Sequence, residues 1–194
     1  VWTGADVATD QGDVVARLTS QIAGGTEFIV PMGERADPQT VQFGNHVDTE
    51  PVGVLAWEAT RIASGIPRIG LDTDARTIPN EIGLYATHLD KGCYRGQETV
   101  ARVHNLGRPP RRLTMLMLDG SDAELPDPGA SVILEGRKVG QLGGVAMHHE
   151  LGPVGLALLK RNVSVDAVPT VDGVAASQTI LVDPEVGLHV RPQL

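Results

Sequence analysis

The sequence has few aromatic residues, a single cysteine and no long apolar run. Aromatic residues make up 3% of its 194 residues, so Val, Leu, Ile and Ala have to fill any hydrophobic core. One cysteine excludes an internal disulfide framework and is typical of a reducing compartment. No apolar run approaches the length of a transmembrane helix, and we expect no signal peptide. These absences predict a soluble cytoplasmic protein that does not contact a membrane.

The charge balance argues against a nucleic-acid-binding protein. The formal net charge is -8, so a broad cationic surface is not expected and no direct nucleic-acid partner is predicted. A local basic patch is still expected where Arg108, Arg111 and Arg112 lie close together in the sequence. Hydrophobic residues at 41% and charged residues at 21% are typical of a folded, globular chain.

The first fifty residues predict a small α+β segment. We expect a strand at Val1–Thr3, a helix with apolar positions at 14, 15, 18 and 22, and a short strand at Glu27–Pro31. The chain starts with Val1 and opens directly on a predicted strand, which suggests a piece of a longer protein.

A helix is predicted from Val52 to Ser64, with Gly65 ending it. Arg61 lies near the predicted C-terminus of the helix, where the helix dipole favours a cation, so a purely structural role is one interpretation of this residue. Asp72 and Asp74 follow in a loop. Two carboxylates without a nearby histidine favour turn formation over metal binding, so no metal site is predicted.

After the stiff Pro109–Pro110 pair, short strands and turns predict a small antiparallel β-barrel. Adjacent His148 and His149 are expected to point to opposite faces of a strand, which argues against a shared metal ion. The predicted strands are residues 111–118, 131–134, 138–148, 154–160 and 179–182.

The stretch from Lys91 to Gly107 carries most of the chemically active side chains. Gly92 and Gly96 allow tight backbone turns, and a helix is predicted from Gln97 to His104. Around these glycines and at the start of the helix lie the only cysteine and several polar groups, which are Lys91, Cys93, Tyr94, Arg95, Gln97 and Glu98. Two cations and a helix start favour a thiolate at Cys93. A buried, inert cysteine is the alternative interpretation.

These residues carry a family resemblance. The run KGCYRGQE at 91–98 resembles the KGCYxGQE signature of the YgfZ family, which is related to the glycine-cleavage T-protein. RIASGIPRIGLDTD at 61–74 and IPNEIGL at 78–84 are similar to a helix, a glycine turn and a Pro-x-Glu element that both families share. The resemblance extends from about Val52 onward.

The resemblance implies a fold and a cofactor. Residues 1–107 are expected to form the C-terminal part of a T-protein-like folate-binding region, and residues 108–194 a β-barrel domain. The implied cofactor is tetrahydrofolate or a one-carbon derivative. Glu81 occupies the place of the glutamate that holds the pterin in T-proteins, although a first-turn glutamate also suits the helix dipole. Arg61 is implied to lie close to the folate.

The resemblance also implies a function, which is support of iron–sulfur cluster assembly or repair and thereby of tRNA-modifying enzymes. Cys93 and Lys91 are the candidate catalytic residues, and Arg95, Gln97 and Glu98 are expected to support them. Tyr94 either contributes to the cofactor site or packs against the barrel. The implied partners are folate, iron–sulfur proteins or their assembly factors, and an N-terminal portion of the same precursor that completes the folate site.

Two other functions stay open. One is a T-protein-type aminomethyltransferase that acts on tetrahydrofolate, although T-proteins lack the cysteine signature. The other is a non-catalytic scaffold whose barrel binds partner proteins. Whether the chain is an enzyme is therefore an open question at this level.

Overall fold

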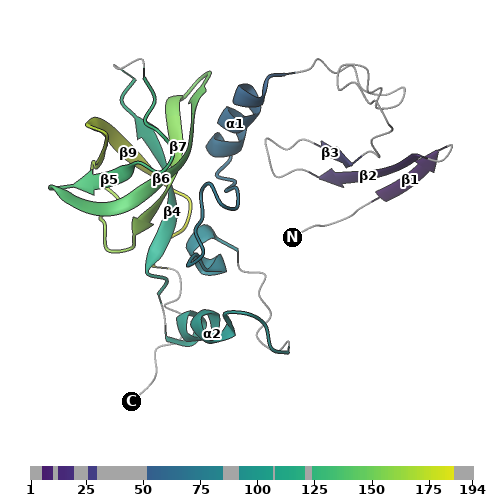
Figure 1. Cartoon of the computed structure of the whole chain (residues 1–194), viewed down its shortest axis with the longest axis horizontal. Coiled ribbons are helices and arrows are strands. Elements are labelled where there is room, and N and C mark those ends of the chain that lie inside the picture. The colour runs from purple at the N-terminus through teal and green to yellow at the C-terminus, as the bar shows by residue number, and fades with distance from the viewer. Residues whose placement is uncertain are drawn as a thin grey trace.

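The computed structural model describes residues 6–10, 13–19, 26–29, 52–84, 92–106, 108–120 and 124–185. In these residues it shows a small three-stranded sheet, a closed barrel, and helical segments between them (Figure 1). This confirms the mixed α and β content that the sequence predicted. Within the described residues, no helix is long and apolar enough to cross a membrane.

The N-terminal sheet corrects one prediction. Strands β1 (Asp6–Asp10), β2 (Asp13–Thr19) and β3 (Thr26–Ile29) pair antiparallel in the order β1-β2-β3. The prediction of a helix around positions 14–22 is therefore wrong for Asp13–Thr19, which form a strand. The adjacent β-branched pair Val14–Val15 favours a strand, and pairing with strands on both sides outweighs the helical spacing. The predicted strand at Val1–Thr3 lies outside the described residues.

Helix α1 (Val54–Ala63) forms as predicted, and Gly65, with φ of 70°, follows its C-cap Ser64. The fold divides the apolar side chains of this helix between the core and the surface. Ala59 and Ile62 are buried in a hydrophobic cluster with barrel residues, whereas Val54 is 70% and Leu55 is 77% exposed. The helix therefore rests on the barrel through its C-terminal half.

The barrel is confirmed, and its six strands close in the order β4-β7-β6-β5-β8-β9. The sequence missed β8 and placed β9 too late in the chain. The prediction failed here because β8 and β9 are joined by a very short turn at Asp172–Gly173. Both turn residues have positive φ, and the turn brings Val171 into pairing with Val174. The strands are β4 (Arg111–Leu118), β5 (Ser131–Leu134), β6 (Arg137–His148), β7 (Gly152–Lys160), β8 (Thr170–Val171) and β9 (Val174–Ile180).

Strands β4 and β7 are buried on both faces. Inside the barrel, Leu116 and Leu159 belong to one apolar cluster. On the outside, Leu113 and Leu156 pack in a second cluster with Ile62 of α1. Because the segment from α1 onward covers the outer face, these strands are nearly continuous apolar runs instead of alternating ones.

Two short helical segments connect α1 to the barrel. The 3-10 helix η2 (Pro79–Ile82) contacts β4, and helix α2 (Gln97–Leu106) lies beside η2. Figure 1 shows α2 at the lower end of the molecule, away from the barrel body. The domain boundary near residue 107 stays a prediction.

Candidate functional site

The loop before α2 presents the cysteine. Gly96 has φ of 80°, a conformation that glycine adopts without strain, and its carbonyl accepts hydrogen bonds from the amides of Thr99 and Val100. The helix therefore starts directly after the tight turn, as the sequence predicted. Cys93 lies four residues before Gln97, the first residue of the helix.

Gln97 links the loop to the helix. Its Oε1 accepts a hydrogen bond of 3.2 Å from the Tyr94 amide, and its Nε2 lies 3.9 Å from Sγ of Cys93. The cysteine is a free thiol and is exposed, so the alternative of a buried cysteine is wrong. The side chain of Gln97 thus fixes the loop and brings an N–H donor to the sulfur.

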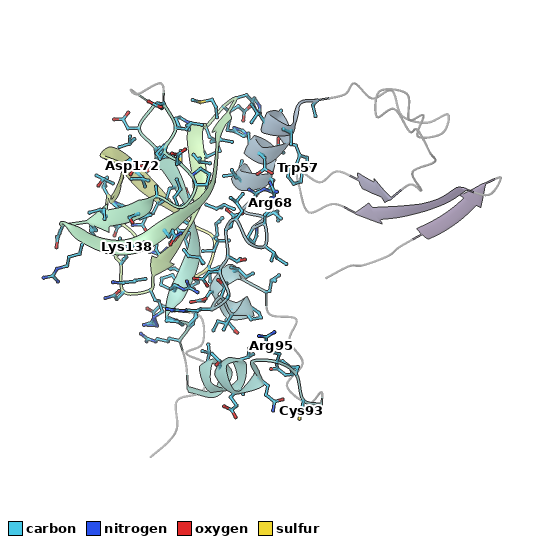
Figure 2. All side chains as sticks on the ribbon, viewed as in Figure 1. Trp57, Arg68, Cys93, Arg95, Lys138 and Asp172 are labelled. Carbon is cyan, nitrogen blue, oxygen red and sulfur yellow. The ribbon has the colours of Figure 1, made fainter. Side chains whose placement is uncertain are left out.

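An open hollow of about 470 Å³ lies at this loop and is lined by the residues from Cys93 to Thr99. Figure 2 shows Cys93 at the outer end of the α2 segment and Arg95 on the side of α2 nearer to η2. Arg95 and Glu98 are exposed, and Tyr94 is half-buried. The hollow therefore combines a thiol, an amide and a phenol ring on one surface. Lys91 lies outside the described residues.

Glu81 lies in the first turn of η2 and is held there by an ion pair. Its side chain is fully buried, and its two oxygens accept 2.9 Å hydrogen bonds from Nε and Nη2 of Arg111. The Ile78 amide donates a third bond, of 3.1 Å, to Oε2. This paired arrangement of a guanidinium and a carboxylate is strong and directional. In the described structure Glu81 thus joins η2 to the first residue of β4.

Arg111 also binds Asp74. Nη1 of Arg111 lies 2.7 Å from Oδ2 of Asp74, and the hydrogen bond from Arg111 holds the pKa of Asp74 well below its usual range. The hydrogen bonds that Arg111 donates to Glu81, followed by those that it donates to Asp74, raise the pKa of Arg111. Sequence reasoning missed this network, because Arg111 lies 37 residues from Asp74 and 30 residues from Glu81 in the chain.

Arg61 occupies a second, separate network. Its guanidinium is 1% exposed and donates to Asp72 at 2.9 Å and to Glu58 at 2.7 Å. Arg68 also pairs with Glu58. Burial works to raise the pKa of Glu58, but the hydrogen bonds and charges of Arg61 and Arg68 outweigh it, so that this pKa is lowered. The arginine thus has structural partners on α1 and on the following loop.

The expected basic patch after the signature does not form. Arg111 is paired with acids as described, and Arg112 is 0% exposed inside the barrel, where its Nη2 donates to Oε1 of Gln178 at 2.8 Å. Burial lowers the pKa of Arg112. Arg108 pairs with Glu185 at 3.3 Å. Neighbours in a strand point to opposite sides, so Arg111 and Arg112 cannot share a surface.

The orientation of the His148 and His149 rings also differs from the prediction. Their ring centroids lie 4.4 Å apart, because β6 ends at His148 and His149 is already in the turn. The rings therefore do not point to opposite faces of a strand. Among the described residues, no group of three or more His, Cys, Asp or Glu side chains could hold a metal ion.

The structure thus separates the predicted residues into three places. The cysteine loop brings together Cys93, Tyr94 and Gln97, while Glu81 and Arg61 lie in two distinct ion-pair networks beside the barrel. Their assignment to folate stays a prediction. The signal that could have located the Arg61 network is the gathering of both signs of charge in the segment 58–74, which holds Glu58, Arg61, Arg68, Asp72 and Asp74.

Comparison with known proteins supports the resemblance at the family level. The chain is 36% identical over 80 residues to the tRNA-modifying protein YgfZ of Colwellia psychrerythraea, covering 40% of this chain and 24% of that protein. It is 37% identical over 82 residues to the tRNA-modifying protein YgfZ of Escherichia coli, covering 41% of this chain and 24% of that protein. The chain is similar to YgfZ proteins. No family model matches it.

A further relative is a chloroplastic protein of Arabidopsis thaliana that carries a provisional transferase name. It is 37% identical over 93 residues, which is 47% of this chain and 21% of that protein. The chain therefore spans about a fifth to a quarter of the length of the curated relatives it matches. Each alignment covers less than half of the chain, a shorter stretch than the resemblance expected from Val52 onward.

Proposed function

We propose that this chain is part of a YgfZ-like protein that binds tetrahydrofolate and supports the assembly or repair of iron–sulfur clusters. The enzymes served include those that modify tRNA. The observation that carries the proposal is the exposed thiol of Cys93, held at the start of α2 with the Gln97 amide 3.9 Å away. The similarity to proteins named tRNA-modifying protein YgfZ supports the link to tRNA.

The thiol has three chemical targets in this proposal. As a thiolate, its sulfur can donate an electron pair to the iron of a partner's cluster, or to a folate-borne carbon while the folate nitrogen leaves with the electrons of its C–N bond. It can also attack a partner's disulfide, which forms a mixed disulfide and releases the partner's second sulfur as a thiolate. All three require access from solvent, which the exposed position and the open hollow provide. The amide of Gln97 can stabilise negative charge on sulfur, and Lys91 and Arg95 are the proposed nearby cations.

Folate binding is the second part of the proposal, with Glu81, Arg61 and Tyr94 as the cofactor residues. A pterin needs a carboxylate that accepts two parallel hydrogen bonds. Glu81 supplies such a carboxylate, but Arg111 already donates to both of its oxygens. A pterin at Glu81 therefore competes with Arg111, and an N-terminal portion of the same protein would supply the rest of the site.

The decisive experiment uses the full-length protein in cells that lack it. Cys93→Ser replaces one sulfur atom with oxygen. It should reduce the content of modified nucleosides in tRNA, measured by mass spectrometry, to that of cells that lack the protein. Ser177→Ala on the exposed side of β9 is the matched control and should restore wild-type content. Calorimetric titration with tetrahydrofolate should show equal binding by both variants. If Cys93→Ser restores full modification, the thiol chemistry is wrong and the scaffold interpretation is favoured.

A transferase is the second candidate, because one relative carries a transferase name. An aminomethyltransferase would move a methylene group from a lipoyl carrier to tetrahydrofolate and release ammonia. The full-length protein, incubated with an aminomethyl-lipoyl carrier and tetrahydrofolate, should release no ammonia above background if the first proposal holds. Turnover at enzymatic rates would favour the transferase.

A further inference from the structure

A pocket of about 330 Å³ lies between the loop after α1 and the outer face of the barrel. One wall is the loop segment from Leu71 to Asp74, and the other is formed by β6 and β7 together with Arg111 of β4. Its volume falls in the range of sites that hold small molecules. Figure 2 shows Lys138 of β6 on the barrel, far from Cys93 beside α2. The pocket is therefore separate from the cysteine loop.

The walls of the pocket are held in place by buried hydrogen bonds. Asp72 has a fully buried side chain and accepts from Arg61 at 2.9 Å, from the Arg68 amide at 2.7 Å and from the Gly144 amide at 2.6 Å. The last bond connects the loop directly to β6. Because the carboxylate is satisfied on both oxygens, the loop cannot move away without leaving a buried charge unpaired. The pocket is thus formed before any ligand arrives.

The lining combines apolar side chains, two carboxylates (Asp72 and Asp74) that are already paired with arginines, and two cations without such partners among the described residues. Leu71, Val139 and Leu158 supply apolar surface. Lys138 and Lys160 also line the pocket, and neither has a carboxylate within salt-bridge distance in the part of the chain that the structure describes. Nζ of Lys160 donates to the Lys138 carbonyl at 3.0 Å, which leaves further donors on its ammonium group.

We propose that this pocket binds a small organic anion with an apolar body and one carboxylate group. The apolar body would lie against Leu71, Val139 and Leu158. The carboxylate would lie between Lys138 and Lys160, whose charges are otherwise unmatched on a protein with a net charge of -8. Arg111 is held by Asp74 and Glu81 and would shape the pocket without serving as the main anion partner.

The test is calorimetric titration of the full-length protein with 2-naphthoate, which has a flat apolar body and one carboxylate. The double variant Lys138→Gln with Lys160→Gln should bind about tenfold more weakly, because charge-assisted hydrogen bonds are lost. Arg137→Gln is the matched control, since Arg137 precedes Lys138 on β6 and does not line the pocket. Gln141→Trp should abolish binding by filling the pocket. Unchanged thermal unfolding midpoints would show that the variants remain folded.

The neutral analogue 2-naphthalenemethanol separates charge from apolar contact, and it should bind at least tenfold more weakly than 2-naphthoate. The proposal is overturned if the wild-type protein shows no saturable binding of 2-naphthoate. It is equally overturned if the double lysine variant binds as tightly as wild type, or if Arg137→Gln weakens binding as much as the double variant does. None of these outcomes depends on whether Cys93 supports tRNA modification.

Discussion

At the scale of single residues, Glu81 shows how a fold can give a polar side chain a structural partner. The sequence presents a glutamate in a Pro-x-Glu element, with folate binding implied by resemblance. In the structure this carboxylate is fully buried and accepts two 2.9 Å hydrogen bonds from Arg111. Removing one partner of such a pair leaves an uncompensated charge away from water, which is more damaging than removing both.

Arg111→Met should therefore reduce the free energy of unfolding by about 3 kcal/mol, measured by urea denaturation. The double variant Glu81→Gln with Arg111→Met should lose less than the sum of the two single variants, because no buried charge is then left unpaired. Strict additivity of the two losses would show that the pair does not couple η2 to the barrel.

At the scale of elements, a β-bulge in β6 lets α1 and its following loop pack onto the barrel. The pairing of β6 with β7 shifts register between Leu142 and Val145, and Gly143 and Gly144 lie in this interval. A Cβ atom on Gly143 would lie 2.3 Å from Oδ1 of Asp72 and 2.8 Å from its Cα. The close approach is thus possible only for glycine.

Gly143→Ala should reduce the free energy of unfolding by about 2 kcal/mol, because either the loop or β6 must shift to accept the methyl group. Gly92→Ala is the control, since nothing lies within 4 Å of its added Cβ, and it should change stability by no more than about 0.5 kcal/mol. Chemical denaturation of both variants measures the difference. Equal stability of the two variants would mean that the contact between β6 and Asp72 is not a tight one.

At the scale of the whole molecule, the paired acids predict how stability depends on pH. Arg111 holds the pKa of Asp74 well below its usual range, and the pKa of Glu58 is also lowered. The unfolded chain therefore binds protons before the folded chain does as the pH falls. The stability that these carboxylates contribute is present above pH ~4.5 and is lost progressively below that value.

The urea midpoint of the wild-type protein should accordingly fall as the pH is lowered from 5 to 3. The urea midpoint of Asp74→Asn should fall less steeply between pH 5 and pH 3, because asparagine at position 74 does not titrate. Asp127→Asn, on an exposed turn, is the matched control and should keep the wild-type slope. A wild-type slope in Asp74→Asn would exclude Asp74 as a source of the acid sensitivity.

The sequence by itself determined the features that depend on neighbouring residues. Gly65 and Gly96 mark the end of one helix and the start of another, and the alternation of turns and short apolar runs indicates the barrel. The loop that carries the cysteine before a helix is also a local feature, since Gly96 and Gln97 fix it within a few residues. That the cysteine is exposed was decided by the structure.

Only the tertiary structure decided which charges meet and which strands pair. The segment Asp13–Thr19 has helical spacing, but its pairing with strands on both sides makes it a strand. Arg111 contacts Asp74 and Glu81 across 37 and 30 residues of sequence, and Arg112 is buried although its neighbour is not. These outcomes depend on long-range packing, because a buried charge needs a partner that only the folded chain brings near.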